Sequence, residues 1–198
     1  MSTVKSKKLQ VGTDATSSNN FTIYQPATPD GTLRIGVGNA DSPTEVGKFD
    51  SNGYVATNAP AFSVGKNVDQ TIATSTATKV TFEVENWDLT NDYDISTSTF
   101  TPSVAGYYQF NSTLYWKAGV DNAVVQNILH KNGSSYKYGS IIVGGSTKHI
   151  AVTLSAVAYA NGTTDYFNIY LWQDSGSSNN IDDSEKLSWW DGHLVRAA

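Results

Sequence analysis

Residues 100–110 read FTPSVAGYYQF and place Pro102 and Gly106 just ahead of a run of alternating side chains. A proline and a glycine in this arrangement are typical of a turn that leads into a strand. In a strand that starts at Gly106, successive side chains point to opposite faces. One face then carries Tyr108, Phe110, Leu114 and Trp116, and the other carries Tyr107, Gln109, Asn111, Thr113 and Tyr115. The stretch therefore predicts a long strand with one apolar face and one mixed polar and aromatic face.

The aromatic residues of this strand allow more than one interpretation. A catalytic pocket, a carbohydrate platform and plain packing all use such side chains. Tyrosines that are apolar at one end and hydrogen-bonding at the other suit the core or a subunit interface. We therefore expect core or interface positions for Tyr107, Tyr108, Phe110, Trp116 and, near the C-terminus, Trp190. A sugar-binding platform on the outward face is the alternative.

The rest of the chain also alternates with the period of a strand and shows almost no helical spacing. In residues 79–85, KVTFEVE, three apolar side chains face one way and the polar ones the other. Further strands are predicted at residues 124–129, 150–154 and 165–172. Turn signals separate them at Asn132-Gly133, Gly144-Gly145, Asn161-Gly162 and the polar loop 174–183. Many short strands with frequent turns indicate an all-β sandwich or barrel.

The composition excludes several classes of protein. The chain has 198 residues, no cysteine and a net charge of −5, so it has no disulfide scaffold and no thiolate site. It shows no basic stripe of the kind that nucleic-acid binders carry. The lysines near the N-terminus have no apolar run behind them, so we expect neither a signal peptide nor membrane insertion. No enzyme motif is recognised, and we expect no catalytic residues and no cofactor.

The first 60 residues contain short predicted strands and few apolar side chains. Turn dipeptides at Asp30-Gly31 and Asn52-Gly53 flank short predicted strands at 32–37 and 45–49. The apolar side chains are too few for an independent core, and two or three strands alone are marginally stable. We therefore predict a β-rich adaptor segment (1–60) that needs a partner, a scaffold or its own copies, followed by a second domain (61–198). We also expect the N-terminus, from Met1, to be docked or intertwined.

The opening stretch and three further motifs resemble the C1q/TNF-like jelly roll. They are the phenylalanine, proline, glycine and tyrosines of residues 100–110, the pair Tyr93-Asp94, the hairpin LHKNG at 129–133 and WDGHL at 190–194. The resemblance covers residues 61–198 and implies an all-β jelly-roll sandwich that forms a homotrimer. One departure is Asp165, which follows Gly162 after two threonines, so that hairpin is expected to be longer than in the family.

The N-terminal segment and the chain's LVRAA end resemble structural proteins of tailed bacteriophages, such as tail fibres. This resemblance implies a non-enzymatic virion protein, made in the bacterial cytoplasm and released by lysis. Residues 1–60 would attach it to other virion proteins of the tail or capsid, and the trimeric head would bind the host surface during adsorption. A head fibre or capsid-decoration trimer without receptor role is the alternative. A sugar-cleaving enzyme is a third, less favoured hypothesis.

Two long polar loops, 88–96 and 174–186, are the predicted places for contact with a host glycan or protein, because loops without strand pattern carry such contacts. The candidate residues are Asp88, Asp92, Asp94, Asp174, Asn179, Asn180, Asp182 and Asp183. Their acidic clusters also resemble oxygen ligands of calcium, which some C1q-like heads bind, but they lack EF-hand spacing. A solvated acidic surface is the favoured interpretation. His130, His149 and His193 have no zinc spacing within one chain, although copies of one histidine could meet on a trimer axis.

Overall fold

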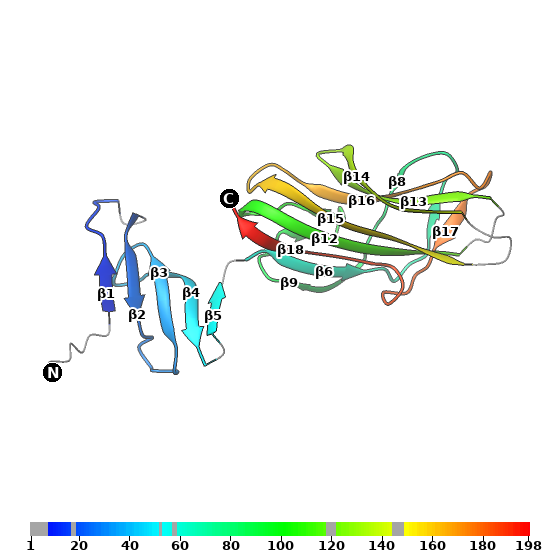
Figure 1. Cartoon of the computed structure of the whole chain (residues 1–198). Coiled ribbons are helices and arrows are strands. Elements are labelled where there is room, and N and C mark those ends of the chain that lie inside the picture. The colour runs from blue at the N-terminus through cyan, green and yellow to red at the C-terminus, as the bar shows by residue number, and fades with distance from the viewer. Residues whose placement is uncertain (1–7, 17–18, 52, 57–58, 118–121, 144–148) are drawn as a thin grey trace. The chain divides into compact units, whose positions relative to one another are not determined.

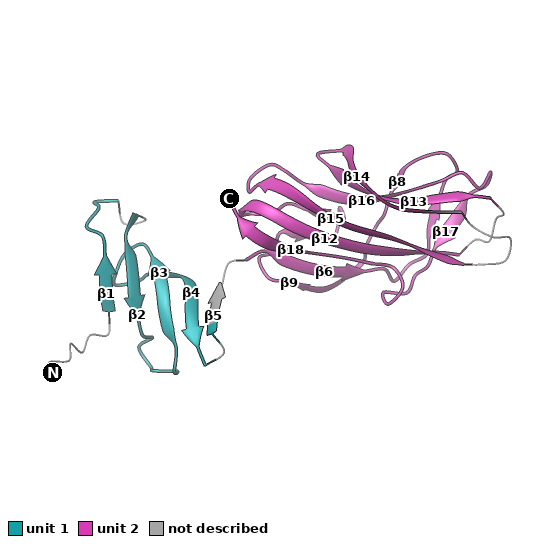
Figure 2. Ribbon diagram, viewed as in Figure 1, with its two compact units in different colours: residues 1–58 teal, residues 59–198 magenta. Residues whose placement is uncertain are grey.

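The computed structural model describes residues 8–16, 19–51, 53–56, 59–117, 122–143 and 149–198. The chain divides into two compact units, Met1–Asn58 and Ala59–Ala198, called the N-terminal unit and the head below (Figure 2). The division falls close to the boundary between 60 and 61 that the sequence predicts, and the roles assigned to the two segments stay predictions. The expected docking of Met1 lies outside the described residues.

The N-terminal unit is one antiparallel sheet of five strands in chain order (Figure 1). Its strands are β1 (Lys8–Val11), β2 (Phe21–Tyr24), β3 (Leu33–Val37), β4 (Thr44–Asp50) and β5 (Gly53–Ala56). The prediction of two or three strands was too low, because the two short edge strands show no clear alternation. Gly31, in the connection between β2 and β3, and Gly53, at the start of β5, have φ angles of 81° and 117°, which glycine adopts at low cost.

No apolar side chain is buried in the described part of residues 8–51. The phenylalanines and leucines of this sheet are about half exposed. This agrees with the expectation that the segment is too poor in apolar residues for a core of its own.

The head is all-β, as predicted, and forms a two-layered sandwich (Figure 1). Its strands are β6 (Ala61–Gly65), β7 (Gln70–Ile72), β8 (Thr78–Lys79), β9 (Val84–Asp88), β10 (Tyr93–Asp94), β11 (Thr99–Phe100), β12 (Ala105–Trp116), β13 (Val124–Lys131), β14 (Ser134–Val143), β15 (Ile150–Asn161), β16 (Phe167–Gln173), β17 (Asn179–Ile181) and β18 (Trp189–Ala197). The seven-stranded sheet runs β7-β17-β12-β18-β6-β9, with β15 on the other side of β12. The six-stranded sheet runs β10-β11-β16-β13-β14, with β8 paired to β16. Strands distant in the chain lie side by side in both sheets, as in a jelly roll.

The core lies between the two sheets and is centred on β12. The buried and outward residues of β12 alternate without interruption, as the sequence predicts, with Ser112 also on the buried side. Phe62 stacks on Phe100 at 4.3 Å between ring centroids and meets Trp190 edge-on at 4.8 Å. Aromatic packing of this kind adds to the burial of apolar area.

Two hairpins of the head follow the turn chemistry of the sequence. Asn132 and Gly133 have φ angles of 53° and 78°, which fits a tight turn between β13 and β14. The connection between β15 and β16 is longer, as expected, because Asn161 Oδ1 accepts hydrogen bonds from the backbone N–H groups of Thr163, Thr164 and Asp165. The predicted turn at Gly144-Gly145 lies outside the described residues.

Two sequence predictions in the head were wrong. Residues 79–85 are not one strand, because β8 pairs with β16 and β9 pairs with β6 in the other sheet. The chain crosses between the sheets at residues 80–83, and Val80 and Phe82 are still fully buried. The loop 174–183 contains the short strand β17, which pairs with β7 and with the end of β12. Strand β17 has only three residues, and only the last one, Ile181, is buried. This is too short for an alternating pattern to show in the sequence.

Candidate functional site

Four of the five predicted core or interface residues lie in the core. Tyr108, Phe110, Trp116 and Trp190 are at most 1% exposed. The Tyr108 hydroxyl donates a hydrogen bond to the backbone carbonyl of Val104 at 2.6 Å. Burial raises the pKa of this phenol well above its usual range. These side chains therefore hold the two sheets together and present no polar group to a ligand.

Tyr107, the fifth residue, points away from the core. Its side chain is 49% exposed and lies edge-on to Tyr159 of β15, with 5.5 Å between ring centroids. The register of β12 and β15 pairs Tyr107 with Tyr159 and Gln109 with Val157. Val157 and Tyr159 are also more than a third exposed. These four residues form a flat, mostly apolar patch on the outward side of the seven-stranded sheet, called the tyrosine face below.

A polar network continues the tyrosine face toward the middle of the sheet. Gln109 Nε2 donates to Ser155 Oγ at 3.0 Å, and Asn111 Nδ2 donates to Asp191 Oδ1 at 3.2 Å. Ser155 Oγ donates to Asn111 Oδ1 at 3.1 Å. Burial raises the pKa of the Asp191 carboxyl, and the Asn111 hydrogen bond offsets part of this effect. These hydrogen bonds tie β12 to β15 on one side and to β18 on the other.

The loop 88–96 uses its three predicted carboxylates to close its own turns. Asp88 accepts hydrogen bonds from the backbone N–H groups of Thr90 and Tyr93. Asp92 Oδ2 accepts hydrogen bonds from the Ser103 backbone N–H at 3.0 Å and from its hydroxyl at 2.9 Å.

The third carboxylate, Asp94, accepts hydrogen bonds from the hydroxyls of Ser96 and Thr97, which hold its pKa below the usual range. A hollow of about 480 Å³ lies beside the loop and is lined by Glu85, Asn91, Asp92, Tyr93, Asp94, Ile95 and Thr101. The loop is therefore ordered by its own hydrogen bonds around a shallow depression.

The loop 174–186 gathers its acidic residues around a cation that the sequence analysis missed. Lys117 Nζ lies 2.7 Å from Asp69, 3.2 Å from Asp182 and 3.5 Å from Asp183. These carboxylates raise the pKa of Lys117, and the pKa of Asp69 is lowered by Lys117. The positive charge that a calcium ion would bring is thus already supplied by an ammonium group. Lys117 and Asp69 are far from the loop in sequence, and no local motif marks them.

The remaining predicted residues of this loop have structural contacts. Asp174 Oδ1 accepts a hydrogen bond from the Val124 backbone N–H at 2.6 Å. Asn179 Nδ2 donates to Ser175 Oγ at 2.8 Å, and Asn180 Oδ1 accepts from the Thr71 hydroxyl at 3.0 Å. Exposed serines at 177 and 178 form the tip of the loop. The tip offers small hydroxyl groups on a rigid base.

The two predicted contact loops lie at opposite ends of the head. The chain enters the head at Ala61, and the backbone carbonyl of Ala61 accepts a hydrogen bond from Leu89 N–H in the first loop. Strand β6 then runs away from this point, and beyond its end Asp69 accepts a hydrogen bond from Asp183 N–H in the second loop. We call these the proximal and distal ends; β17 marks the distal end in Figure 1. The structure does not bring the two loops into one site.

Histidines and metal ligands are not brought together. Within the described ranges, no three His, Cys, Asp or Glu side chains are grouped so that they could hold a metal ion. His130 stacks on Tyr170 at 3.7 Å and is nearly buried, and this burial lowers its pKa. His149 lies 5.7 Å from the Tyr115 ring, and His193 is opposite Gln109 in the sheet.

A second unpredicted cation is the buried Lys66. Its side chain has no exposed surface, and its ammonium group donates to the Thr81 carbonyl at 2.7 Å and to Glu83 Oε1 at 3.2 Å. Burial lowers the pKa of Lys66, and the Glu83 carboxylate opposes this shift. The network fixes the segment that crosses between the two sheets. A lysine directly after a short strand carries no sequence signal for burial.

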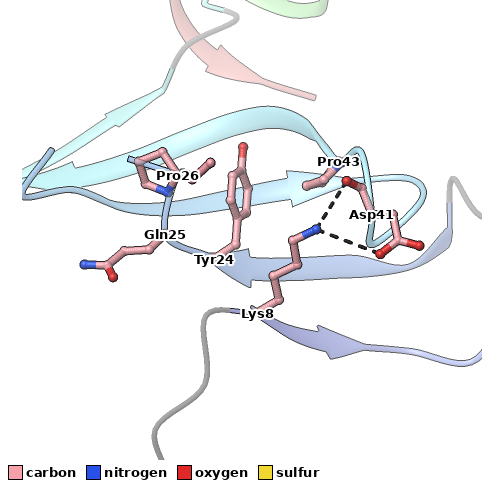
Figure 3. Close-up of a pocket in the computed structure, with 7 residues that line it drawn as sticks. Lys8, Tyr24, Gln25, Pro26, Asp41 and Pro43 are labelled. Carbon is pink, nitrogen blue, oxygen red and sulfur yellow. Dashed lines mark hydrogen bonds and ion pairs between the residues drawn. The ribbon is translucent and has the colours of Figure 1, made fainter. Parts of the chain in front are cut away.

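The N-terminal unit has one described hollow of its own, of about 360 Å³ (Figure 3). It is lined by Lys8, Tyr24, Gln25, Pro26, Ala27, Asp41 and Pro43. Lys8 Nζ donates a hydrogen bond to the Asp41 backbone carbonyl at 3.2 Å and lies 4.0 Å from Asp41 Oδ1. The lining of the hollow combines apolar side chains with the Tyr24 hydroxyl, the Gln25 amide and the exposed pair of Lys8 and Asp41. No helix in the described part of the chain is long and apolar enough to cross a membrane.

Comparisons with known proteins bear on the fold. No family model matches the chain, and no curated protein matches it. Among solved structures, the globular domain of a zebrafish complement 1qA protein is 20% identical with a TM-score of 0.51, covering 70% of this chain and 99% of that one. Eiger TNF from S. frugiperda is 10% identical with a TM-score of 0.54, covering 71% of this chain and 95% of that one. Murine APRIL is 9% identical with a TM-score of 0.55, covering 69% and 99%. The predicted C1q/TNF-like jelly-roll fold is therefore confirmed.

Proposed function

We propose that this chain forms a homotrimeric, non-enzymatic structural protein of a bacteriophage particle, whose head binds the host surface. The observation that supports the trimer is the tyrosine face, an exposed and mostly apolar patch on β12 and β15 of a sheet with C1q/TNF-like topology. Apolar patches rimmed by polar residues mark protein interaction sites. In this proposal, the tyrosine faces of three heads pack around a common axis.

The geometry of the tyrosine face supports a protein partner more than a small ligand. Its residues lie side by side on the outward face of two adjacent strands, whereas ligand sites are concave pockets. The neighbouring network of Gln109, Asn111, Ser155 and Asp191 is polar but internally paired. Apolar and aromatic residues with satisfied polar neighbours are typical of interface cores.

The distal end of the head is the proposed surface for host contact. The proximal loop, including Asp88, Asp92 and Asp94, adjoins the point where the chain enters from residues 1–58. If that segment anchors the protein to the particle, the proximal end faces the particle. The distal end carries the serine-rich tip of loop 174–186 and the ion cluster of Lys117. Three copies of a weakly binding tip gain avidity when they bind together.

The assignment to a virion is supported by the resemblance of the N-terminal segment and of the C-terminal residues to tailed-phage structural proteins. It also fits a small sheet that has no core of its own and needs a supporting assembly. The protein would then reside on the particle, attached through the N-terminal unit to tail or capsid proteins. A host glycan or protein would be the ligand.

Replacing one exposed residue at each end of the head by arginine tests which end binds the host. Ser178 at the distal tip and Thr101 beside the proximal hollow are both exposed. Binding of the purified chain to host cells should fall at least tenfold in Ser178→Arg and stay unchanged in Thr101→Arg. Equal binding by both variants would argue against the distal site.

Antibody labelling of intact particles tests the larger assignment. Labelling at the tail tip would support receptor binding. Labelling over the capsid, together with failure of the purified chain to bind cells or block infection, would favour the decoration trimer. A monomer by sedimentation at micromolar concentration would contradict the trimer itself.

A further inference from the structure

The strand register of the N-terminal unit places its apolar residues on one side. Directly opposed residues in an antiparallel sheet share a face, and the register aligns Leu9, Ile23 and Ile35 across β1, β2 and β3. Leu33 is aligned in the same way with Phe49 of β4. The full set comprises Leu9, Val11, Phe21, Ile23, Leu33, Ile35, Val37 and Phe49, and is called the apolar sheet face below.

Every charged residue of the described strands lies on the other side of this sheet. The register puts Lys8 with Tyr24 and Arg34, and puts Arg34 with Lys48. Arg34 binds Asp30 at 2.6 Å and Glu45 at 2.7 Å. The sheet is therefore amphipathic across its thickness, although each strand is short.

The polar side of the sheet is covered by parts of its own unit. Thr22 is fully buried there, and a Cβ at Gly36 would collide with Pro43 and press on the Tyr24 ring. Tyr24, Pro26 and Pro43 close over this side, with Lys8 and Asp41 at the rim (Figure 3). On the apolar sheet face, by contrast, Leu9, Val11, Phe21, Leu33 and Phe49 are between 44% and 58% exposed. Of the two sides of the described sheet, the apolar one therefore exposes its large side chains to water.

The size and charge of the apolar sheet face limit what can cover it. Two half-exposed phenylalanines offer roughly 200 Å², and three aliphatic side chains bring the patch to on the order of 350 Å² per chain. One such patch is too small for a specific pairwise interface, which needs roughly 1,000 Å². Three patches together bury about that area, but it is divided among three pairwise contacts, so the sheets pack stably only when something else holds the three chains together. The face also carries no charge, so its partner surface must be uncharged and apolar. The apolar sheet face of another copy meets both conditions.

The head brings such copies close to one another. Strand β5 ends at Ala56 and β6 begins at Ala61, so five Cα steps span no more than about 18 Å. In a homotrimer of heads, short tethers raise the effective concentration of the three sheets to the order of millimolar. We infer that the apolar sheet faces of three copies pack together around one axis, so that residues 8–56 form a second trimerisation module. This inference rests on the proposed homotrimer of heads.

Cysteine substitutions in the full chain test this packing, because the protein has no cysteine of its own. Leu9 and Gln10 are adjacent in β1, both exposed, and on opposite sides of the sheet. We expect Leu9→Cys and Leu33→Cys to react with a polyethylene glycol maleimide at least tenfold more slowly than the control Gln10→Cys. A short bismaleimide should join Leu9→Cys or Leu33→Cys chains into dimers on a denaturing gel, because the single thiol of each chain can form only one cross-link, and should leave Gln10→Cys as single chains.

Sedimentation of each variant separates the failure of this inference from failure of the trimer. A trimer in which Leu9→Cys and Leu33→Cys react as fast as Gln10→Cys would overturn the inference and leave the proposed head trimer standing. Slow reaction without inter-chain products would also overturn it, because the cover would then come from the same chain. A monomer would refute both proposals. A Tyr107→Arg substitution that dissociates the heads should restore fast labelling of Leu9→Cys, which would support the coupling between the two modules.

Discussion

Replacing Tyr107 by alanine should weaken the trimer without unfolding the head. About half of the side chain is exposed, which corresponds to roughly 100 Å² that trimer formation can bury. At about 25 cal/mol per Å², this is at most about 2.5 kcal/mol per chain, and about 2 kcal/mol is reasonable because the hydroxyl is polar. Three chains lose about 6 kcal/mol, or about 10⁴-fold in the dissociation constant of the trimer. Concentration enters that constant squared, so the midpoint of dissociation should rise about 100-fold.

Analytical ultracentrifugation over a dilution series measures this midpoint. Tyr138→Ala is the matched control, because Tyr138 is 62% exposed on β14 of the other sheet. That control should dissociate at the wild-type concentration. If Tyr107→Ala also keeps the wild-type midpoint but loses binding to host cells, the carbohydrate-platform interpretation is right and the interface interpretation is wrong.

Four further substitutions probe the head. Phe110→Ala should lower the free energy of unfolding by about 3–5 kcal/mol in urea titrations, since Phe110 is fully buried; a loss below 1 kcal/mol would contradict its place in the core. Glu83→Gln should cost about 3 kcal/mol, more than Lys66→Met, because it leaves a buried ammonium without its counter-charge; the reverse order in thermal unfolding would refute this account. Asp191→Asn should raise thermal stability at pH 7 and lose this advantage in acid. The reason is that the raised pKa of Asp191 gives a contribution to stability that is present below the ordinary carboxyl pKa and is lost as pH rises through the folded-state value. A variant that is less stable at pH 7 would show that the Asn111 hydrogen bond outweighs burial.

Local chemistry made much of the fold predictable. The alternation of β12 and the turn at Asn132-Gly133 depend on neighbours in the sequence, and both appear as expected. Residues 79–85, by contrast, were wrongly predicted as one strand from their alternation alone. Alternation at Val80 and Phe82 reports which side chains face the core, but it does not report which sheet supplies the hydrogen bonds.

The candidate site was less predictable because long-range contacts build it. Asp182 and Asp183 were recognisable as an acidic pair, but their counter-ion Lys117 and the third carboxylate Asp69 come from distant parts of the chain. The separation of the two polar loops follows from the direction of β6, which no motif encodes. Composition could mark both loops as polar, and only the strand topology shows that they lie at opposite ends.

Assembly and stability should be inseparable in this protein if both proposed contacts form. The head has its own core, whereas the described sheet of the N-terminal unit buries no apolar side chain. When only folded chains associate, association raises the apparent free energy of unfolding, and the effect grows with protein concentration. The N-terminal sheet should therefore melt at a temperature that rises with protein concentration and falls in Tyr107→Ala, while melting of the head core depends on concentration less. Hydrogen exchange at β2 and β3 as a function of dilution measures this directly. Exchange that stays equally slow in dissociated chains would show that the sheet is stable alone and does not need other copies to cover its half-exposed apolar face.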